Sequence, residues 1–209
     1  MGDIKIGRVV LGMVSTNCYF VYDEDTRKTL VFDPADEGLR IAKAMKQNEL
    51  EVVGILLTHG HFDHITGANE LRSATSAKIY AYKEEQEVCE STRLNCSEQV
   101  DNLVTIKVNK YLEDGEELEL CGLKCKLIAT PGHTQGSCCY YFENDGILIS
   151  GDTLFNSSVG RSDLPTGSGG TLIRSIKDKL MVLPDDVKVY PGHGDMTTIG
   201  DERRYNPFL

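Results

Sequence analysis

The chain has 209 residues, of which 40% are hydrophobic and 26% are charged, a composition typical of globular domains. Its formal net charge of -10 at pH 7 disfavours binding to nucleic acid, because phosphate binding needs a basic surface. The longest apolar run, Val52–Leu57, is far too short to span a bilayer, and the first residues lack the apolar stretch of a signal peptide. We therefore expect a cytoplasmic protein that binds neither membranes nor nucleic acid.

The first half of the chain predicts strands that alternate with helices. Leu39, Ala42 and Met45 recur at helical spacing after Pro34, whereas the short apolar run Val52–Leu57 is typical of a buried strand. Strands are expected at Asp3–Gly12, Asn17–Tyr22, Thr29–Phe32, Val52–Leu57 and Lys78–Ala81, and helices at Asp36–Gln47, His64–Ser73 and Lys83–Ser91.

The second half repeats this theme after an irregular stretch that ends near Val104. Strand patterns come first and a long helical pattern follows, so each half could form one sheet with helices on its outer side. Strands are expected at Glu117–Leu120, Leu123–Ala129, Ser137–Phe142, Gly146–Ile149 and Val187–Tyr190, and a helix at Thr171–Leu183. Periodicity alone supports a mixed α/β fold and does not give the number of layers.

The five histidines fall in three clusters, and each cluster directly follows a predicted strand. Three fall in the stretch Thr58-His-Gly-His-Phe-Asp-His64, and His133 and His193 each follow a Pro-Gly pair. Residues i and i+2 on an extended backbone point the same way, so His59 and His61 could bind one ion. Asp63 and His64 begin the following helix and could face a second ion. This clustering predicts a metal site, and the ligand types suit Zn, Fe, Mn or Co.

One further carboxylate completes the predicted site. The strand pattern Ile147-Leu-Ile-Ser-Gly-Asp152 places Asp152 at a strand end, behind a glycine that leaves space around it. Alone, such an aspartate more often caps a turn. Beside five histidines in equivalent positions, it becomes a candidate ligand shared by two ions.

These motifs resemble those of the metallo-β-lactamase superfamily, in the same order and over nearly the whole chain. His59 to His64 match its His-x-His-x-Asp-His motif, and Thr130-Pro-Gly-His133, Ser150-Gly-Asp152 and Tyr190-Pro-Gly-His193 match its later motifs. Within the superfamily the chain looks like the glyoxalase II branch, the hydroxyacylglutathione hydrolases, especially its short bacterial members. The resemblance implies a four-layer αββα sandwich of two mixed sheets with outer helices.

The resemblance also implies the role of each ligand. It assigns one set of residues to a first ion, a second set to another ion, and one aspartate to both. The sets are His59, His61 and His133 for the first ion, Asp63, His64 and His193 for the second, and Asp152 as the bridge, with Asp63 and Asp152 also catalytic. The expected cofactors are two divalent metal ions, zinc in the first place, with iron or manganese as alternatives.

The implied reaction is hydrolysis of a thioester by a hydroxide that bridges two ions about 3.5–4 Å apart. Full-length glyoxalase II proteins carry a C-terminal helical domain that binds glutathione, and only 197–209 follow the last ligand motif. We therefore expect a single domain over 1–209 without that helical domain, and weak dependence on the glutathione part of the substrate. True metallo-β-lactamases usually lack the bridging aspartate, which disfavours β-lactam hydrolysis.

Arg161 is the candidate substrate-binding residue. It lies in Gly160-Arg-Ser-Asp-Leu-Pro165, which resembles a loop of short glyoxalase II-like proteins and of persulfide dioxygenases. A guanidinium can hold a substrate carboxylate with two parallel hydrogen bonds. The alternative is an ion pair with Asp163, which would make Arg161 structural.

Three other functions remain open at this point. A persulfide dioxygenase would bind a single iron, an RNA phosphodiesterase shares the ligand set, and a non-catalytic metal-binding module needs no substrate. The expected partner is a small-molecule thioester, and a homodimer is compatible with the sequence. Cys121 and Cys125 have the spacing of zinc ligands, but no second pair lies nearby. We expect them to flank a hairpin, and the odd total of seven cysteines fits a reducing compartment.

Overall fold

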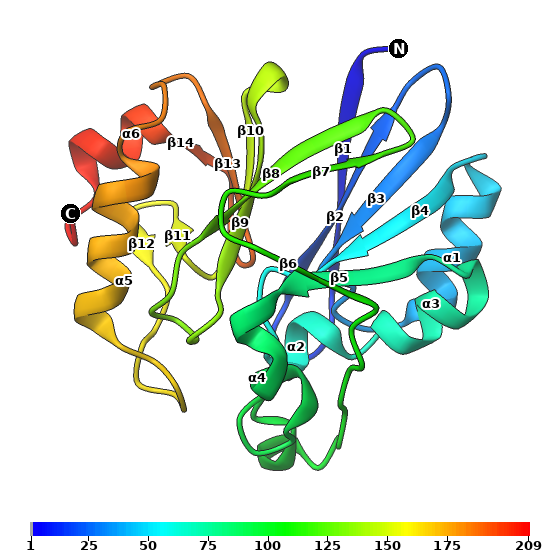
Figure 1. The fold of residues 1–209 in the computed structure, drawn as a ribbon, viewed down its shortest axis with the longest axis horizontal. Coiled ribbons are helices and arrows are strands. Elements are labelled where there is room, and N and C mark those ends of the chain that lie inside the picture. The colour runs from blue at the N-terminus through cyan, green and yellow to red at the C-terminus, as the bar shows by residue number, and fades with distance from the viewer. Residues whose placement is uncertain (1) are drawn as a thin grey trace.

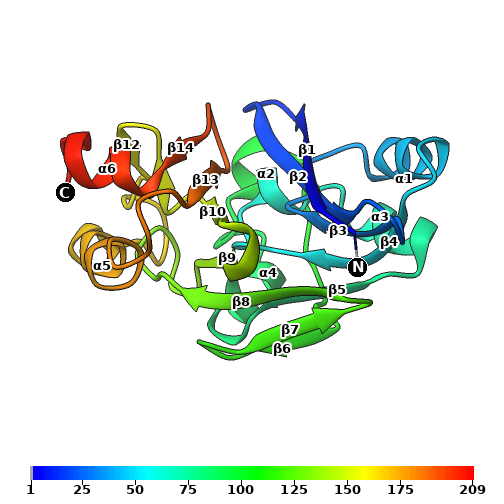
Figure 2. The ribbon, with the colours of Figure 1, turned by 90° about the horizontal axis from the view of Figure 1, so that it is seen from above.

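The computed structural model describes residues 2–209, and it contains two six-stranded sheets that face each other. Figure 1 shows the first sheet with α1 and α3 on its outer side, and the second sheet with α5 and α6 on the opposite side. Figure 2 shows the same order of layers from above. The four-layer αββα sandwich expected from the sequence is confirmed.

The first sheet comes from the first half of the chain. Its strands follow one another in chain order, antiparallel from β1 to β3 and parallel from β3 to β6. They are β1 (Ile4–Leu11), β2 (Thr16–Asp23), β3 (Lys28–Phe32), β4 (Glu51–Leu56), β5 (Lys78–Tyr82) and β6 (Lys110–Leu112). The helices of this half are α1 (Gly38–Gln47), α2 (Phe62–Ile65), α3 (Ala68–Thr75) and α4 (Gln86–Glu90), with 3₁₀ turns η1 (Lys83–Glu85) before α4 and η2 (Ser97–Val100) after it.

The second sheet has the order β14-β13-β10-β9-β8-β7, in which only the β10–β13 pair is parallel. Its strands are β7 (Glu117–Leu120), β8 (Leu123–Ala129), β9 (Cys138–Phe142), β10 (Ile147–Gly151), β13 (Lys188–Pro191) and β14 (Thr197–Thr198). A small hairpin of β11 (Leu154–Phe155) and β12 (Ser158–Val159) follows β10, and the 3₁₀ turn η3 (Glu143–Asp145) joins β9 to β10. The helices are α5 (Gly169–Ser175), its π-helical continuation η4 (Ile176–Leu180), and α6 (Ile199–Tyr205).

Three apolar clusters fill the spaces between the four layers. In β3, Val31 packs toward α1 and α3, while Leu30 and Phe32 face the second sheet. This alternation follows from the two-residue period of a strand. Leu148 of β10 packs instead against α5 and α6, within the third cluster. Strands buried on both faces explain why so many of these segments read as continuous apolar runs.

The structure differs from the expected elements in three places. The helix expected at His64–Ser73 is two helices, because the chain bends at Gly67, whose amide donates to Pro34 O and where a Cβ would lie 2.7 Å from Asp36 O. The helix expected at Thr171–Leu183 ends as the π-helical turn η4. Short β6, β11, β12 and β14 and the final α6 were not predicted. Within residues 2–209, no helix is long and apolar enough to cross a membrane.

Candidate metal centre

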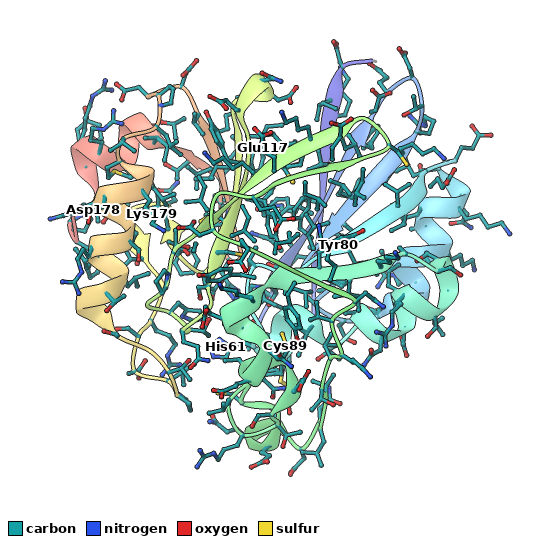
Figure 3. The ribbon with its side chains drawn as sticks, viewed as in Figure 1. His61, Tyr80, Cys89, Glu117, Asp178 and Lys179 are labelled. Carbon is teal, nitrogen blue, oxygen red and sulfur yellow. The ribbon has the colours of Figure 1, made fainter. Side chains whose placement is uncertain are left out.

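The predicted ligands meet at one edge of the sandwich because each follows the C-terminal end of a strand. His59 follows β4, His133 follows β8, Asp152 follows β10, and His193 follows β13. Figure 3 shows His61 at the lower ends of the two sheets, beside α4. The two sheets therefore supply ligands to the same place from opposite sides.

Three histidines form one tight group. His61 Nδ1 lies 2.8 Å from His133 Nε2, which lies 3.2 Å from His59 Nε2. All three side chains are at most 3% exposed. Three imidazole nitrogens that converge at these distances, with their ring planes nearly perpendicular, could hold one metal ion.

A second group lies next to the first. Asp63 Oδ2 is 3.5 Å from His64 Nε2 and 3.3 Å from His193 Nε2. These three residues also satisfy the geometry of a metal-binding group. The ring centroids of His59 and His64 are only 4.1 Å apart, so the two groups are neighbours.

Asp152 lies between the two groups. Its Oδ1 is 3.3 Å from His64 Nε2, and its Oδ2 is 3.6 Å from both His133 Nε2 and His193 Nε2. One carboxylate therefore faces nitrogens of both groups. This is the position that the sequence resemblance implies for a ligand shared by two ions.

The residues present fit bound divalent cations. Among the described residues, the buried atoms His64 Nε2 and Asp152 Oδ1 lack a hydrogen-bond partner, although buried polar atoms are almost always paired. Both atoms point into the centre. Imidazole nitrogens and carboxylate oxygens form the mixed donor set that suits zinc, iron or manganese.

Asp33 fixes two of the histidines from behind. It directly follows β3 and accepts hydrogen bonds from Thr58 N, Thr58 Oγ1 and His64 Nδ1, at 2.8, 2.6 and 3.0 Å. Because Thr58 donates its hydroxyl proton to Asp33, it can accept the proton of His59 Nδ1, which lies 3.1 Å away. Both histidines therefore carry their proton on Nδ1 and leave Nε2 free for a metal.

A backbone carbonyl group, a hydroxyl group and a side-chain amide orient three further ligands or their loops. His133 Nδ1 lies 2.7 Å from the carbonyl oxygen of Arg161, which leaves His133 Nε2 facing the centre. Thr16 Oγ1 donates to Asp63 Oδ2 at 2.9 Å. Asn17 of β2 donates to Pro191 O and Gly194 O, on either side of His193, at 2.8 and 2.9 Å. Groups of the first sheet thereby position a loop of the second.

Burial and the neighbouring charges shift the pKa values of the predicted ligands in different directions. Burial, with added repulsion from neighbouring histidines, lowers the pKa of His59 well below its usual value and lowers the pKa of His61 to about 3. Burial also acts on His64, but the carboxylates around it raise its pKa well above the usual value. Burial opposes ionisation of Asp63 and Asp152, yet the histidines lower the pKa of both carboxyl groups. The aspartates are thus anionic and His59 and His61 are neutral, whereas the raised pKa values of His64 and His193 favour protonated imidazoles beside the carboxylates, and a bound cation would displace those protons.

Arg161 contacts the centre through its backbone. Its guanidinium forms two hydrogen bonds with Asp163, both at 2.8 Å, and its side chain is 61% exposed. The ion pair that was the structural alternative is therefore present. The remaining guanidinium N–H groups stay available to a ligand at this loop.

Two residues with clear supporting contacts were missed at the sequence level, Asp33 and Glu85. Asp33 is the last residue before Pro34 at a strand end, which is a weak signal on its own. Glu85 looks no different in sequence from the exposed Glu84 and Glu87. Cys121 is exposed in the β7–β8 turn and Cys125 is buried in β8, and the metal-binding groups found in residues 2–209 contain no cysteine.

Comparison with known proteins agrees with this geometry. Residues 11–193 match the Metallo-beta-lactamase superfamily. "Probable metallo-hydrolase YqgX" of Bacillus subtilis (strain 168) is 37% identical over 208 residues, which cover 99% of this chain and 98% of that protein. "Hydroxyacylglutathione hydrolase GloC" of Haemophilus influenzae (strain ATCC 51907 / DSM 11121 / KW20 / Rd) is 34% identical and is covered over 92% of both chains.

Solved structures show the same fold. The BLEG-1 B3 metallo-beta-lactamase has a TM-score of 0.93 at 35% identity, with 98% of this chain and 99% of that chain covered. ETHE1 from Myxococcus xanthus has a TM-score of 0.82 at 29% identity, with 97% and 83% covered. TTHA1623 in a di-iron-bound form has a TM-score of 0.84 at 33% identity, with 97% and 100% covered. The chain belongs to the metallo-β-lactamase superfamily of metal-dependent hydrolases.

Proposed function

We propose that this protein is a binuclear metal-dependent thioester hydrolase of the glyoxalase II type, acting on hydroxyacylglutathione and related thioesters. The observation that carries the proposal is the pair of adjacent three-residue donor groups with Asp152 between them. His59, His61 and His133 would hold one ion, and Asp63, His64 and His193 the other. Asp152 would contact both ions, which are zinc in this proposal.

Two divalent ions at this position would supply Lewis-acid charge and bring the pKa of a bound water near neutrality. Asp63 and Asp152 are anionic and line the same space, so they can accept hydrogen bonds from that water and orient it. Attack of a water oxygen on the thioester carbonyl carbon would form the new carbon–oxygen bond and break the carbon–sulfur bond, with one water proton released to solvent and the other transferred to the thiolate, so that the products are a carboxylate and a thiol. The leaving thiolate belongs to a thiol with a pKa of about 8.5, so no strong general acid is required.

The relatives support this substrate class. GloC of H. influenzae carries the name hydroxyacylglutathione hydrolase, and the alignment covers 92% of its length. A protein of about this size can therefore bear that activity. The di-iron-bound form of TTHA1623 supports two ions and keeps iron open as their identity.

The test is metal analysis of the purified protein together with S-lactoylglutathione hydrolysis. We expect two metal ions per chain and release of glutathione at a rate that a chelator abolishes. A simple-thiol lactoyl ester and a chromogenic cephalosporin complete the panel. Hydrolysis of the cephalosporin alone would contradict the proposal and favour the β-lactamase activity for which BLEG-1 is named.

The likeness to ETHE1 from M. xanthus favours one second candidate, a persulfide dioxygenase. Such an enzyme would use one Fe(II) held by two histidines and a carboxylate. The group of Asp63, His64 and His193 contains such a set. Oxygen consumption with glutathione persulfide, at one iron per chain, would replace the thioesterase proposal with this one.

A further inference from the structure

Glu85 is a buried carboxylate that takes no part in the proposed chemistry. It ends η1, three residues after β5, and is 1% exposed. Within residues 2–209 it forms no ion pair with a lysine, arginine or histidine. Burying a carboxylate without a cation is costly unless hydrogen bonds compensate.

Three hydrogen bonds do so, and all come from the loops that carry the first metal-binding group. Gly60 N donates to Glu85 Oε1 at 2.7 Å, and Gly60 lies between His59 and His61. Thr134 Oγ1 and Gly136 N donate to Oε2 at 2.9 and 2.8 Å. Since Thr134 directly follows His133, one carboxylate connects the neighbours of three histidines.

The backbone around Glu85 is wedged between the same two loops. A Cβ at Gly60 would lie 3.0 Å from Cys89 N, and a Cβ at Gly136 would lie 2.6 Å from Glu85 Cα. A side chain at Gly136 would therefore overlap the backbone of Glu85, and one at Gly60 would fit only tightly against Cys89. Figure 3 shows Cys89 beside His61 at this place. Because the fit is close, a displacement of Glu85 would also displace both loops.

The second metal-binding group is held by different residues. Thr16 donates to Asp63, and Asn17 donates to the carbonyl groups that flank His193. None of these contacts involves Glu85. Asp33 supports His64 of this group and, through Thr58, also His59 of the first group, but the hydrogen bonds of Glu85 reach only the loops of the first group, which makes a selective effect measurable.

We propose that Glu85 is a positioning residue that holds the His59–His61 loop and the His133 loop together, and thereby sets the affinity of the first metal-binding group without setting that of the second. This rests on the metal site of the proposed function. Burial raises the pKa of Glu85 to about 7. The three hydrogen bonds act in the opposite direction and favour the ionised carboxylate.

The test variant is Glu85→Gln, which keeps the shape but turns one N–H of the amide toward a backbone N–H of Gly60 or Gly136. Metal binding is followed by chelator competition with Zn²⁺, and by hyperfine-shifted imidazole N–H signals in the Co²⁺ form. We expect a 10- to 100-fold loss of affinity at one of the two sites, the usual effect of removing an outer ligand support. The imidazole N–H signals that are lost should be those of the three histidines of the first metal-binding group.

Two matched variants sharpen the result. Glu84→Gln changes an exposed neighbour and should leave both affinities at wild-type values. Thr16→Val removes the hydroxyl group that contacts Asp63. It should weaken metal binding at the second group, and the imidazole signals lost should then be those of its two histidines. If Glu85→Gln does not fold, Thr134→Val removes one of the three hydrogen bonds and should weaken the first site to a smaller degree.

Unchanged affinities in Glu85→Gln would overturn the inference while leaving the proposed function intact. Equal weakening of both sites with a lower melting temperature would also overturn it, because Glu85 would then support only the fold. A wild-type protein that binds no metal would contradict the proposed function itself, and this inference with it.

Discussion

Hydrogen bonds to single atoms decide which nitrogen of three of the histidines faces the centre. Asp33 and Thr58 hold the Nδ1 protons of His64 and His59, and the Arg161 carbonyl faces His133 Nδ1. The motifs named all seven proposed ligands, which the structure brings together, because each lies in a short recognisable sequence. They could not predict Asp33, because only the fold brings it to a histidine 31 residues away.

Replacement of Asp152 tests the shared ligand. Asp152→Ala removes the only one of the seven proposed ligands assigned to both ions, so we expect fewer than two ions per chain and loss of nearly all hydrolysis. Metal analysis and S-lactoylglutathione turnover measure both effects. Asp195→Ala is the control, because that carboxylate is 88% exposed and lies two residues after His193. Two ions with near-normal turnover in Asp152→Ala would show that Asp152 is not a bridge.

Arg161→Ala separates substrate binding from support of the site. The carbonyl group that orients His133 remains in the variant, so kcat should be nearly unchanged. If the guanidinium holds a substrate carboxylate, KM for acidic thioesters should rise by a factor that corresponds to about 1.5–3 kcal/mol of lost binding free energy. KM for uncharged thioesters should not change. Equal loss on all substrates would make the pair with Asp163 purely structural.

At the scale of strands and loops, close backbone packing shapes the metal centre. The loop after β13 passes so close to the loop after β10 that Gly192 has no room for a side chain: a Cβ there would overlap Asp152 Oδ1 and lie 2.7 Å from His64 Cε1. The Pro-Gly-His pattern marked this turn in the sequence. The break at Gly67 was not predictable, because it depends on contacts with 34–36 from another part of the chain.

Gly192→Ala should therefore displace Asp152 or His64 and reduce metal binding at least tenfold, while far-ultraviolet circular dichroism stays close to wild type. Gly170→Ala in α5 is a matched control, since no atom lies within 4 Å of its added methyl group. Alanine also favours a helix by about 0.8–1 kcal/mol over glycine, so this control should bind metal normally. Normal metal binding in Gly192→Ala would show that the loop can move aside.

The whole molecule consists of two halves, each a sheet with its outer helices, and both halves supply residues to the metal centre at one edge. The elements of each half follow apolar patterns that the sequence displays, which is why most strands were predicted within two residues. The layer count came from the family resemblance, because no local pattern states which sheet faces which. Short edge strands such as β6 and β14 depend on neighbours for their hydrogen bonds, and this explains why they were missed.

Metal removal should destabilise the entire fold. Ligands from both sheets meet at the centre, and an ion that binds only the folded state adds about 4.1 kcal/mol at a thousandfold excess over its Kd. Differential scanning calorimetry before and after chelation should show a clearly lower Tm for the metal-free protein, restored by added Zn²⁺. A Tm that does not respond to chelation would mean that no ion occupies the centre.

The most direct test of a two-metal thioester hydrolase is titration of the metal-free protein with Zn²⁺ while S-lactoylglutathione hydrolysis is measured. The proposed function predicts that activity rises to a plateau at two equivalents per chain. A plateau at one equivalent, or no hydrolysis at any ratio, would contradict it.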